Sequence, residues 1–320
     1  MAESFVLIDA AGPSFTPLRY GILAVAERPT PADSKWLHGI VRDERFCGVP
    51  DSYPLLPCTG SPYPEGGLVP TDAEGIVFPE SDAFQVYAWL PCSPVGMGND
   101  LERLRSRTRQ ALTDGAPRAV EPVFWTGETS IAGSTIYPHL ASDVMVTGGP
   151  MGATGPHTVR QRAADEVTTA AVDITEAVGL VEEQLAECYG GEGIIHVPRR
   201  ALAALDNAYL ARREGDQLRT LSGNRIAAYS GEGVGNAPDG TTPAAGVRWI
   251  YGTGMAQVYS SPPKELGLVP GEFIGKADNT TVFVIAQNYL LTWDCCLVAA
   301  EVQFGGAASG AVGAAGGVAA

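Results

Sequence analysis

The stretch Gly193-Ile-Ile-His-Val-Pro-Arg-Arg-Ala-Leu-Ala-Ala-Leu205 decides the fold class of this chain. Its first six residues are an apolar run closed by a proline, which predicts a short buried strand. A helix is predicted next over 199–213, because apolar residues recur there at helical spacing. A longer amphipathic helix is predicted over 165–189 and stops at Gly190-Gly191. Helices mixed with strands of uneven length indicate an α+β fold.

Short apolar segments continue on the C-terminal side of this unit. They predict strands over 218–221, 225–229, 247–251 and 256–259. The Gly-, Pro-, Thr- and Asn-rich residues 231–245 form a loop between the middle two. The β-branched and aromatic residues of 280–293 and 297–304 predict a closing strand pair. After Phe304 only Gly, Ala, Ser and Val occur, so this tail is expected to be flexible.

The N-terminal half is less regular. Residues 1–45 are interpreted as an extended arm with a strand-like stretch over 20–25. Residues 46–80 are dense in Gly and Pro, which is typical of an interacting loop, and a strand is predicted over 84–90. A helix rich in arginine is predicted over 100–112. Beyond this helix, an interruption or kink of the chain is expected at Gly115, Pro117 and Pro122.

Composition excludes several classes of function. The 320 residues include 36 acidic and 21 basic ones, for a net charge of −15, which argues against a protein that neutralises nucleic-acid phosphates or binds an anionic membrane. The only lysines are Lys35, Lys264 and Lys276. No secretory signal pattern is visible, and the apolar run 280–293 is too short to span a membrane. We therefore expect the chain to be made and folded in a cytoplasm.

The cysteines and histidines do not have metal-ligand spacing. No CxxC pair occurs, and Cys295-Cys296 are interpreted as small buried hydrophobic residues. A cross-link among Cys47, Cys58 and Cys92 remains open, and a cytoplasmic origin argues against it.

No catalytic, cofactor-binding or metal-binding residue is predicted. The glycine clusters at 148–155 and 231–235 do not open a helix after a strand, as phosphate loops do. The carboxylates at 165–166, 182–183 and 187 are interpreted as a solvated helix face. His196 lies inside an apolar strand and is interpreted as a hydrogen-bonded core histidine.

The order of the segments resembles that of the major capsid protein of tailed bacteriophages, which has the Hong Kong 97-type fold. Phages that infect actinobacteria give the nearest resemblance. The resemblance spans about Phe84 to Phe304. It rests on the opening stretch 193–205 and on three further stretches: Arg219-Thr-Leu-Ser-Gly-Asn-Arg-Ile226, Trp249-Ile-Tyr-Gly-Thr-Gly-Met-Ala-Gln-Val258 and Tyr289-Leu-Leu-Thr-Trp-Asp-Cys-Cys-Leu-Val-Ala-Ala-Glu-Val302.

The resemblance implies a division of the chain. The implied parts are an N-terminal arm (1–45), an extended E-loop with its flanking strands (46–95), a peripheral domain with a spine helix (96–164), an axial domain (165–260), the closing strands of the peripheral domain (261–304) and a flexible tail (305–320).

The resemblance further implies a structural protein, not an enzyme, that self-assembles into the icosahedral shell around phage double-stranded DNA. Implied partners are copies of itself in hexamers and pentamers, with a separate scaffolding protein, a maturation protease and a portal. No cofactor, membrane or sequence-specific DNA contact is implied, and the expected location is the virion, assembled in the host cytoplasm. Because no lysine stands between Lys35 and Lys264, we expect no lysine-based cross-link in the E-loop.

Two alternatives stay open. One is a compartment shell of the encapsulin type or another virion structural protein. The more remote one is a hydrolase that acts through His196 or Cys188.

Overall fold

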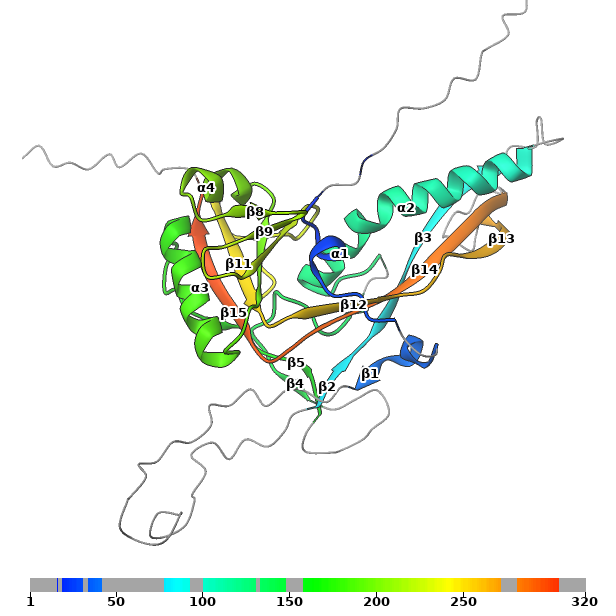
Figure 1. Cartoon of the computed structure of the whole chain (residues 1–320). Helices are drawn as coiled ribbons and strands as arrows, with labels where there is room; N and C mark the ends of the chain where they lie inside the picture. The colour runs from blue at the N-terminus through cyan, green and yellow to red at the C-terminus, as the bar shows by residue number, and fades with distance from the viewer. Residues whose placement is uncertain are drawn as a thin grey trace, which may run out of the picture.

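The computed structural model describes residues 16, 19–30, 34–41, 78–92, 100–130, 133–147, 158–271 and 281–304. Within them the chain forms helices and three β-sheets, an α+β architecture as predicted. Figure 1 shows a compact part around α3 and α4, from which α2 and a long sheet extend to one side.

The compact part is built on a seven-stranded sheet, called here the large sheet. Its strand order is β6 (Asp165–Glu166), β15 (Leu297–Gln303), β11 (Val247–Thr253), β7 (Ile194–Pro198), β10 (Arg225–Tyr229), β9 (Gln217–Arg219) and β8 (Arg212–Glu214). Helices α3 (Ile174–Cys188) and α4 (Ala201–Asn207) pack on it through an apolar cluster that includes Val181, Leu185 and Leu205. Ile195 and Val197 of β7 face this layer, whereas Ile194 belongs to the main apolar cluster on the other face, so β7 is buried throughout.

The second sheet, called here the long sheet, is organised around β14 (Thr281–Trp293). Strand β3 (Ala83–Cys92) pairs antiparallel with it along one edge. Strands β12 (Ala256–Ser260) and β13 (Lys264–Pro270) pair with it on the other edge, one after the other. The 27-residue helix α2 (Asp100–Thr126) lies along β3 and β14 (Figure 1). Their contact is an apolar cluster around Leu112, Phe283 and Ile285.

A small third sheet lies below the other two in the view of Figure 1. Its order is β1 (Ile40–Val41), β2 (Phe78–Ser81), β5 (Thr158–Gln161) and β4 (Val146–Thr147). The short helices α1 (Ile22–Val25) and η1 (Lys35–His38) precede it in the chain.

The segment 19–30 joins the large and long sheets. The main-chain N–H of Ala228 in β10 donates to the carbonyl of Tyr20, and the N–H of Val258 in β12 donates to the carbonyl of Glu27 at 2.8 Å. Between these bonds Ile22 and Val25 of α1 are buried in the main apolar cluster. Residues 19–30 are therefore part of the folded core.

Two chain crossings connect the large sheet with the long sheet, and we call them together the sheet junction. Residues 254–255 lead from β11 to β12, and residues 294–296 lead from β14 to β15. The N–H of Asp294 donates to the carbonyl of Met255 at 3.2 Å, so the two crossings are in contact.

Several sequence predictions are confirmed by the structure, and others need correction. Strands over 84–90, 225–229, 247–251 and 256–259 are present with small changes of boundary. The predicted closing strand pair is wrong, because β14 and β15 lie in different sheets. Residues 20–25 form helix α1 at Ile22–Val25 instead of a strand, since their apolar side chains fill the core between the sheets.

Three predicted helices have different limits. Helix α3 starts at Ile174, because Asp173 caps it and Asp165–Glu166 pair with β15. Helix α4 ends at Asn207, since Tyr209 takes a left-handed φ of 57° and β8 comes next. Helix α2 continues to Thr126 through Pro117 and Pro122.

Candidate functional site

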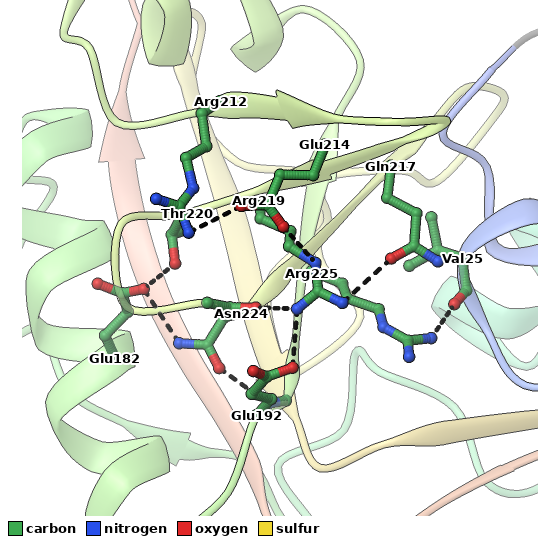
Figure 2. Close-up of polar contacts among 12 residues, drawn as sticks. Val25, Glu182, Glu192, Arg212, Glu214, Gln217, Arg219, Thr220, Asn224 and Arg225 are labelled. Carbon is green, nitrogen blue, oxygen red and sulfur yellow. Dashed lines mark hydrogen bonds and ion pairs between the residues drawn. The ribbon is translucent and has the colours of Figure 1, made fainter.

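The most developed polar cluster of the described residues lies at the β8 edge of the large sheet (Figure 2). Arg219 at the end of β9 is its centre. Its Nη1 donates to Glu192 Oε2 and to the carbonyl of Gly223, both at 2.7 Å. Its Nε lies 3.3 Å from Glu214 Oε2, and Glu214 also pairs with Arg212 of the edge strand at 2.9 Å. These ion pairs tie the β8–β9 hairpin to the start of β7.

Glu182 of α3 holds the turn 220–224 that leads from β9 to β10. Its carboxylate accepts hydrogen bonds from the hydroxyl of Thr220 and the side-chain amide of Asn224, the latter at 3.0 Å (Figure 2). It also accepts from the hydroxyl of Ser222 at 2.9 Å. The other end of the Asn224 amide accepts from the N–H of Gly193 at 2.8 Å. A single carboxylate thus connects helix, turn and strand.

The cluster also reaches the N-terminal segment. Arg225 Nη1 donates to the carbonyl of Val25 at 2.8 Å (Figure 2). Arg213 of the edge strand donates to the Tyr20 hydroxyl at 2.7 Å. The β8–β9 hairpin and the turn after it are therefore anchored to the start of β7, to α3 and to the N-terminal segment.

This rigid edge presents apolar side chains to solvent. Tyr209, which comes after α4, is 86% exposed, and Leu221, at the tip of the held turn, is 71% exposed. A cavity of about 610 Å³ opens beside the turn, and Glu182, Glu183 and Glu192 are among its lining residues. Exposed apolar groups on a stiff polar frame suit contact with another protein.

Chemically, the hydroxyls of Thr220 and Ser222 and the amide of Asn224 all donate to the one Glu182 carboxylate, an arrangement that holds the turn. Arg219, Glu192 and Glu214 are already engaged with one another in ion pairs. The hydrogen bond and charge of Arg219 hold the pKa of Glu192 below its usual value, so this carboxylate stays ionised. An ionised, ion-paired carboxylate is a poor general acid at neutral pH.

His196 is a satisfied core residue, as predicted. It is buried in β7, with Nδ1 2.6 Å from the Tyr229 hydroxyl and Nε2 2.8 Å from the Thr253 hydroxyl. Burial lowers its pKa to about 3, so the ring is neutral at physiological pH. The ring also packs edge-on against Phe124 of α2. Both nitrogens are occupied and no solvent reaches them, which does not suit a catalytic base.

The predicted solvated face of carboxylates is only partly correct. Glu183 and Glu187 point from α3 towards solvent. Glu182 instead holds the turn 220–224, and Asp165–Glu166 lie in β6, not on the helix. Burial raises the pKa of Glu166, and the nearby carboxylates of Asp143, Asp239 and Glu301 raise it further. The sequence signal for this role is the spacing of Thr220, Ser222 and Asn224. It places three hydrogen-bond donors on one side of a turn, where one acceptor can bind them all.

The cysteines also differ from prediction. Cys188 at the end of α3 forms a disulfide with Cys296 in the sheet junction. Cys295 and Cys296 are both disulfide-bonded instead of acting as free buried hydrophobic residues, and Cys188 is the partner of Cys296 in this structure. Cys47 and Cys58 lie outside the described residues, and Cys92 is the last residue of β3.

A second charged contact joins α2 to the rim of the long sheet. Glu265 of β13 accepts from Arg105 Nε at 2.8 Å and from Arg109 Nη2 at 2.6 Å. These two arginines of the predicted helix therefore fix its position over the sheet. The exposed apolar side chains of this part of the molecule are Tyr87, Leu101 and Leu268.

The described residues form neither a cluster of metal ligands nor a membrane-spanning helix. They bring together no group of three or more His, Cys, Asp or Glu side chains that could hold a metal ion. No helix among these residues has the length and apolar character needed to cross a membrane.

Comparisons with known proteins give similar structures but no similar sequence. Neither the protein-family models nor the curated proteins contain a match. The chain is similar to the capsid of a native GTA particle, with 13% identity, coverage of 93% of this chain and 95% of that chain, and a TM-score of 0.49. A structure of Gordonia phage Cozz has 12% identity, coverage of 94% of this chain and 92% of that chain, and a TM-score of 0.49.

A third similar structure is the holo-SrpI encapsulin complex from Synechococcus elongatus. It has 9% identity, coverage of 93% of this chain and 97% of that chain, and a TM-score of 0.42. At TM-scores below 0.5 these likenesses do not decide the function, which has to come from the architecture and surfaces of the chain itself.

Proposed function

We propose that this chain is the major capsid protein of a tailed bacteriophage, a Hong Kong 97-type subunit that assembles with its own copies into an icosahedral shell. The observation that carries the proposal is the extension formed by α2 and the long sheet (Figure 1). At about 1.5 Å per residue, the 27 residues of α2 measure roughly 40 Å, more than the diameter of a small domain. A thin two-layer extension of this length suits a plate in a shell.

The surfaces of the extension and of the large sheet support contacts between copies. Tyr87 alternates with Val86 and Ala88, which pack towards α2, so its half-exposed ring points away from the helix. Strand β8 is an edge of the large sheet, and all three of its residues are exposed. An exposed sheet edge is a liability in a monomer and a binding surface in an assembly.

The division of the chain is part of the same proposal. Residues 165–260 would form the axial domain around symmetry axes, with 231–245 nearest the axis. Residues 96–164 and 261–304, with α2 as spine helix, would form the peripheral domain. Residues 1–45 would supply the arm and 46–95 the E-loop, while 305–320 would be a tail.

The shell would enclose double-stranded DNA without binding its sequence. The net charge of −15 supports this, because like charges keep packaged DNA from adhering to the wall. A separate scaffolding protein, a protease and a portal would be its partners, and assembly would take place in the host cytoplasm. The protein would not be an enzyme, since His196 has both ring nitrogens occupied in the core.

Assembly is tested by co-expression with the scaffolding protein, followed by electron microscopy and sedimentation velocity. Hollow particles that protect DNA from nuclease are expected when the full set of head proteins is present. Tyr87→Asp is expected to reduce particle yield at least tenfold while the unfolding temperature of the subunit stays the same. Glu187→Gln, an exposed change on α3, is the matched control. Monomers under all of these conditions would overturn the proposal, and particles filled with an enzyme instead of DNA would favour the encapsulin alternative.

A further inference from the structure

The disulfide between Cys188 and Cys296 joins two parts of the fold that have different attachments. Cys188 is the last residue of α3, which packs on the large sheet. Cys296 belongs to the crossing 294–296, which brings the chain from the long sheet. The two residues are 108 positions apart in sequence, so the bond closes a long loop. It therefore fixes one crossing of the sheet junction to the helix layer of the large sheet.

The disulfide is accessible to small molecules. A surface cavity of about 380 Å³ is lined by Cys188 and Cys296 together with Met145, Arg162, Asp165 and Leu297. Both bonded cysteines are only partly buried. A volume of a few hundred Å³ admits a molecule the size of a tripeptide thiol. Thiol–disulfide exchange requires such access of the attacking thiolate to one sulfur atom.

The sheet junction is also held by other contacts, among them a disulfide bond of Cys295 in the same crossing. The crossings 254–255 and 294–296 are joined by the hydrogen bond from the N–H of Asp294 to the carbonyl of Met255. The relative orientation of the two sheets depends on these crossings, on segment 19–30 and on the apolar cluster around α2. A covalent bond at the crossing thus restricts the movement of one sheet relative to the other.

We propose that Cys188 and Cys296 form a thiol–disulfide exchange site that takes small thiols and disulfides of the glutathione class and locks the sheet junction when it is oxidised. In oxidation the two cysteine thiols lose two protons and two electrons and form the Sγ–Sγ bond. One glutathione disulfide gains them and becomes two glutathione thiols. In a reducing cytoplasm the pair is a dithiol, and it closes in an oxidising medium. The proposal that the disulfide closes after assembly rests on the proposed function. The exchange chemistry itself does not rest on it.

The test is made on the purified full-length chain, without assembly. The chain is equilibrated natively with millimolar reduced glutathione or with glutathione disulfide, then trapped by alkylation and digested. Tandem mass spectrometry, which distinguishes Cys296 from its disulfide-bonded neighbour Cys295 within one peptide, is expected to find Cys188 and Cys296 alkylated after the first treatment and linked to each other after the second. Hydrogen exchange of the Asp294 amide is expected to be about tenfold faster in the dithiol form. The unfolding temperature of that form is expected to be lower by roughly 5–10 °C.

Two variants control the test. Cys188→Ser is expected to show the fast Asp294 exchange in both media, with no response to oxidant. Cys58→Ser is expected to retain the Cys188–Cys296 link and its response. A link that survives native reduced glutathione, or thiols that never close with glutathione disulfide, would overturn the exchange site. A link that responds while the Asp294 exchange rate does not change would overturn the locking of the junction. None of these results depends on particle formation, so they are separate from the test of the shell.

Discussion

Gly254 in one crossing of the sheet junction lies directly against the main-chain carbonyl of Asp294 in the other. A Cβ at position 254 would overlap that carbonyl oxygen and would also meet the Tyr189 ring. The two chains that connect the large and long sheets therefore approach as closely as backbone permits. Glycine is required here for contact, not for an unusual φ.

We predict that Gly254→Ala destabilises the subunit by about 3 kcal/mol, because the crossings have to separate to admit a methyl group. Urea unfolding followed by circular dichroism measures the loss. Gly179→Ala is the matched control: Gly179 is an exposed residue of α3, and a Cβ there meets nothing within 4 Å. Removing a helical glycine is expected to stabilise by about 0.5–1 kcal/mol. Equal effects of the two changes would contradict the close approach at the junction.

Glu182→Gln is predicted to lower the free energy of unfolding by about 1–3 kcal/mol. The carboxylate accepts from Thr220, Ser222 and Asn224, and a glutamine amide offers one acceptor oxygen and sets its NH₂ group against the remaining donors. Glu183→Gln, a change at the neighbouring carboxylate, is expected to alter stability by less than about 0.5 kcal/mol. Chemical denaturation of both variants measures the difference. An unchanged free energy of unfolding in Glu182→Gln would show that the turn 220–224 is stable without this carboxylate.

Stability is predicted to fall as the medium is acidified below about pH 6.5. Burial lowers the pKa of His196 to about 3 and that of His139 to about 4, from 6.5 in each case. Between these values the unfolded chain binds protons that the folded chain does not, so unfolding becomes easier as pH falls. Each histidine contributes a slope of about 1.4 kcal/mol per pH unit.

His196→Gln is expected to remove one of these two slopes between pH 4.5 and 6. The measurement is the free energy of unfolding at several pH values. The variant is also expected to be less stable at pH 7, because the hydrogen bonds to Tyr229 and Thr253 change, so the slope and not the absolute value is the readout. His38→Gln, at a histidine of η1, serves as control, and a His196→Gln slope equal to that of the native chain would contradict a neutral buried ring.

Mature particles are predicted to dissociate completely to single chains of 33.4 kDa when boiled in detergent with a reducing agent. The physical reason is that the sequence has no lysine between Lys35 and Lys264 that could form an isopeptide bond from the 46–95 segment. Denaturing gel electrophoresis checks this. A ladder of multimers that resists reduction would show a covalent cross-link of another chemistry.

The sequence identified most strands but not their partners. Segments 280–293 and 297–304 have continuous apolar patterns, as strands with two covered faces do, and this pattern contains no information on which sheet each joins. Their separation is decided at Asp294–Cys296, where Cys295 takes a φ of 53° and the chain changes sheet. Such a crossing depends on contacts with residues 254–255, far away in the sequence, and has no local signal.

The limits of α2 show the opposite effect, in which tertiary burial overrides a local signal. Pro117 and Pro122 each remove a helical hydrogen bond, and so predict an interruption. The helix continues because Val120, Phe124 and Trp125 are buried between the two sheets. The role of Glu182 was missed for a similar reason, since its partners lie 38 to 42 residues further along the chain.

The pairing of β3 with β14 has a consequence for how the subunit folds. Gln85 and Asn288 are hydrogen-bonded neighbours in this pair, although 203 residues separate them in sequence. Contacts at such separation incur a large loop-closure entropy and form late, whereas β7, α4, β9 and β10 meet within a short stretch of chain. We therefore expect β7, α4, β9 and β10, and also β12, β13 and β14, to come together before β3 pairs with β14.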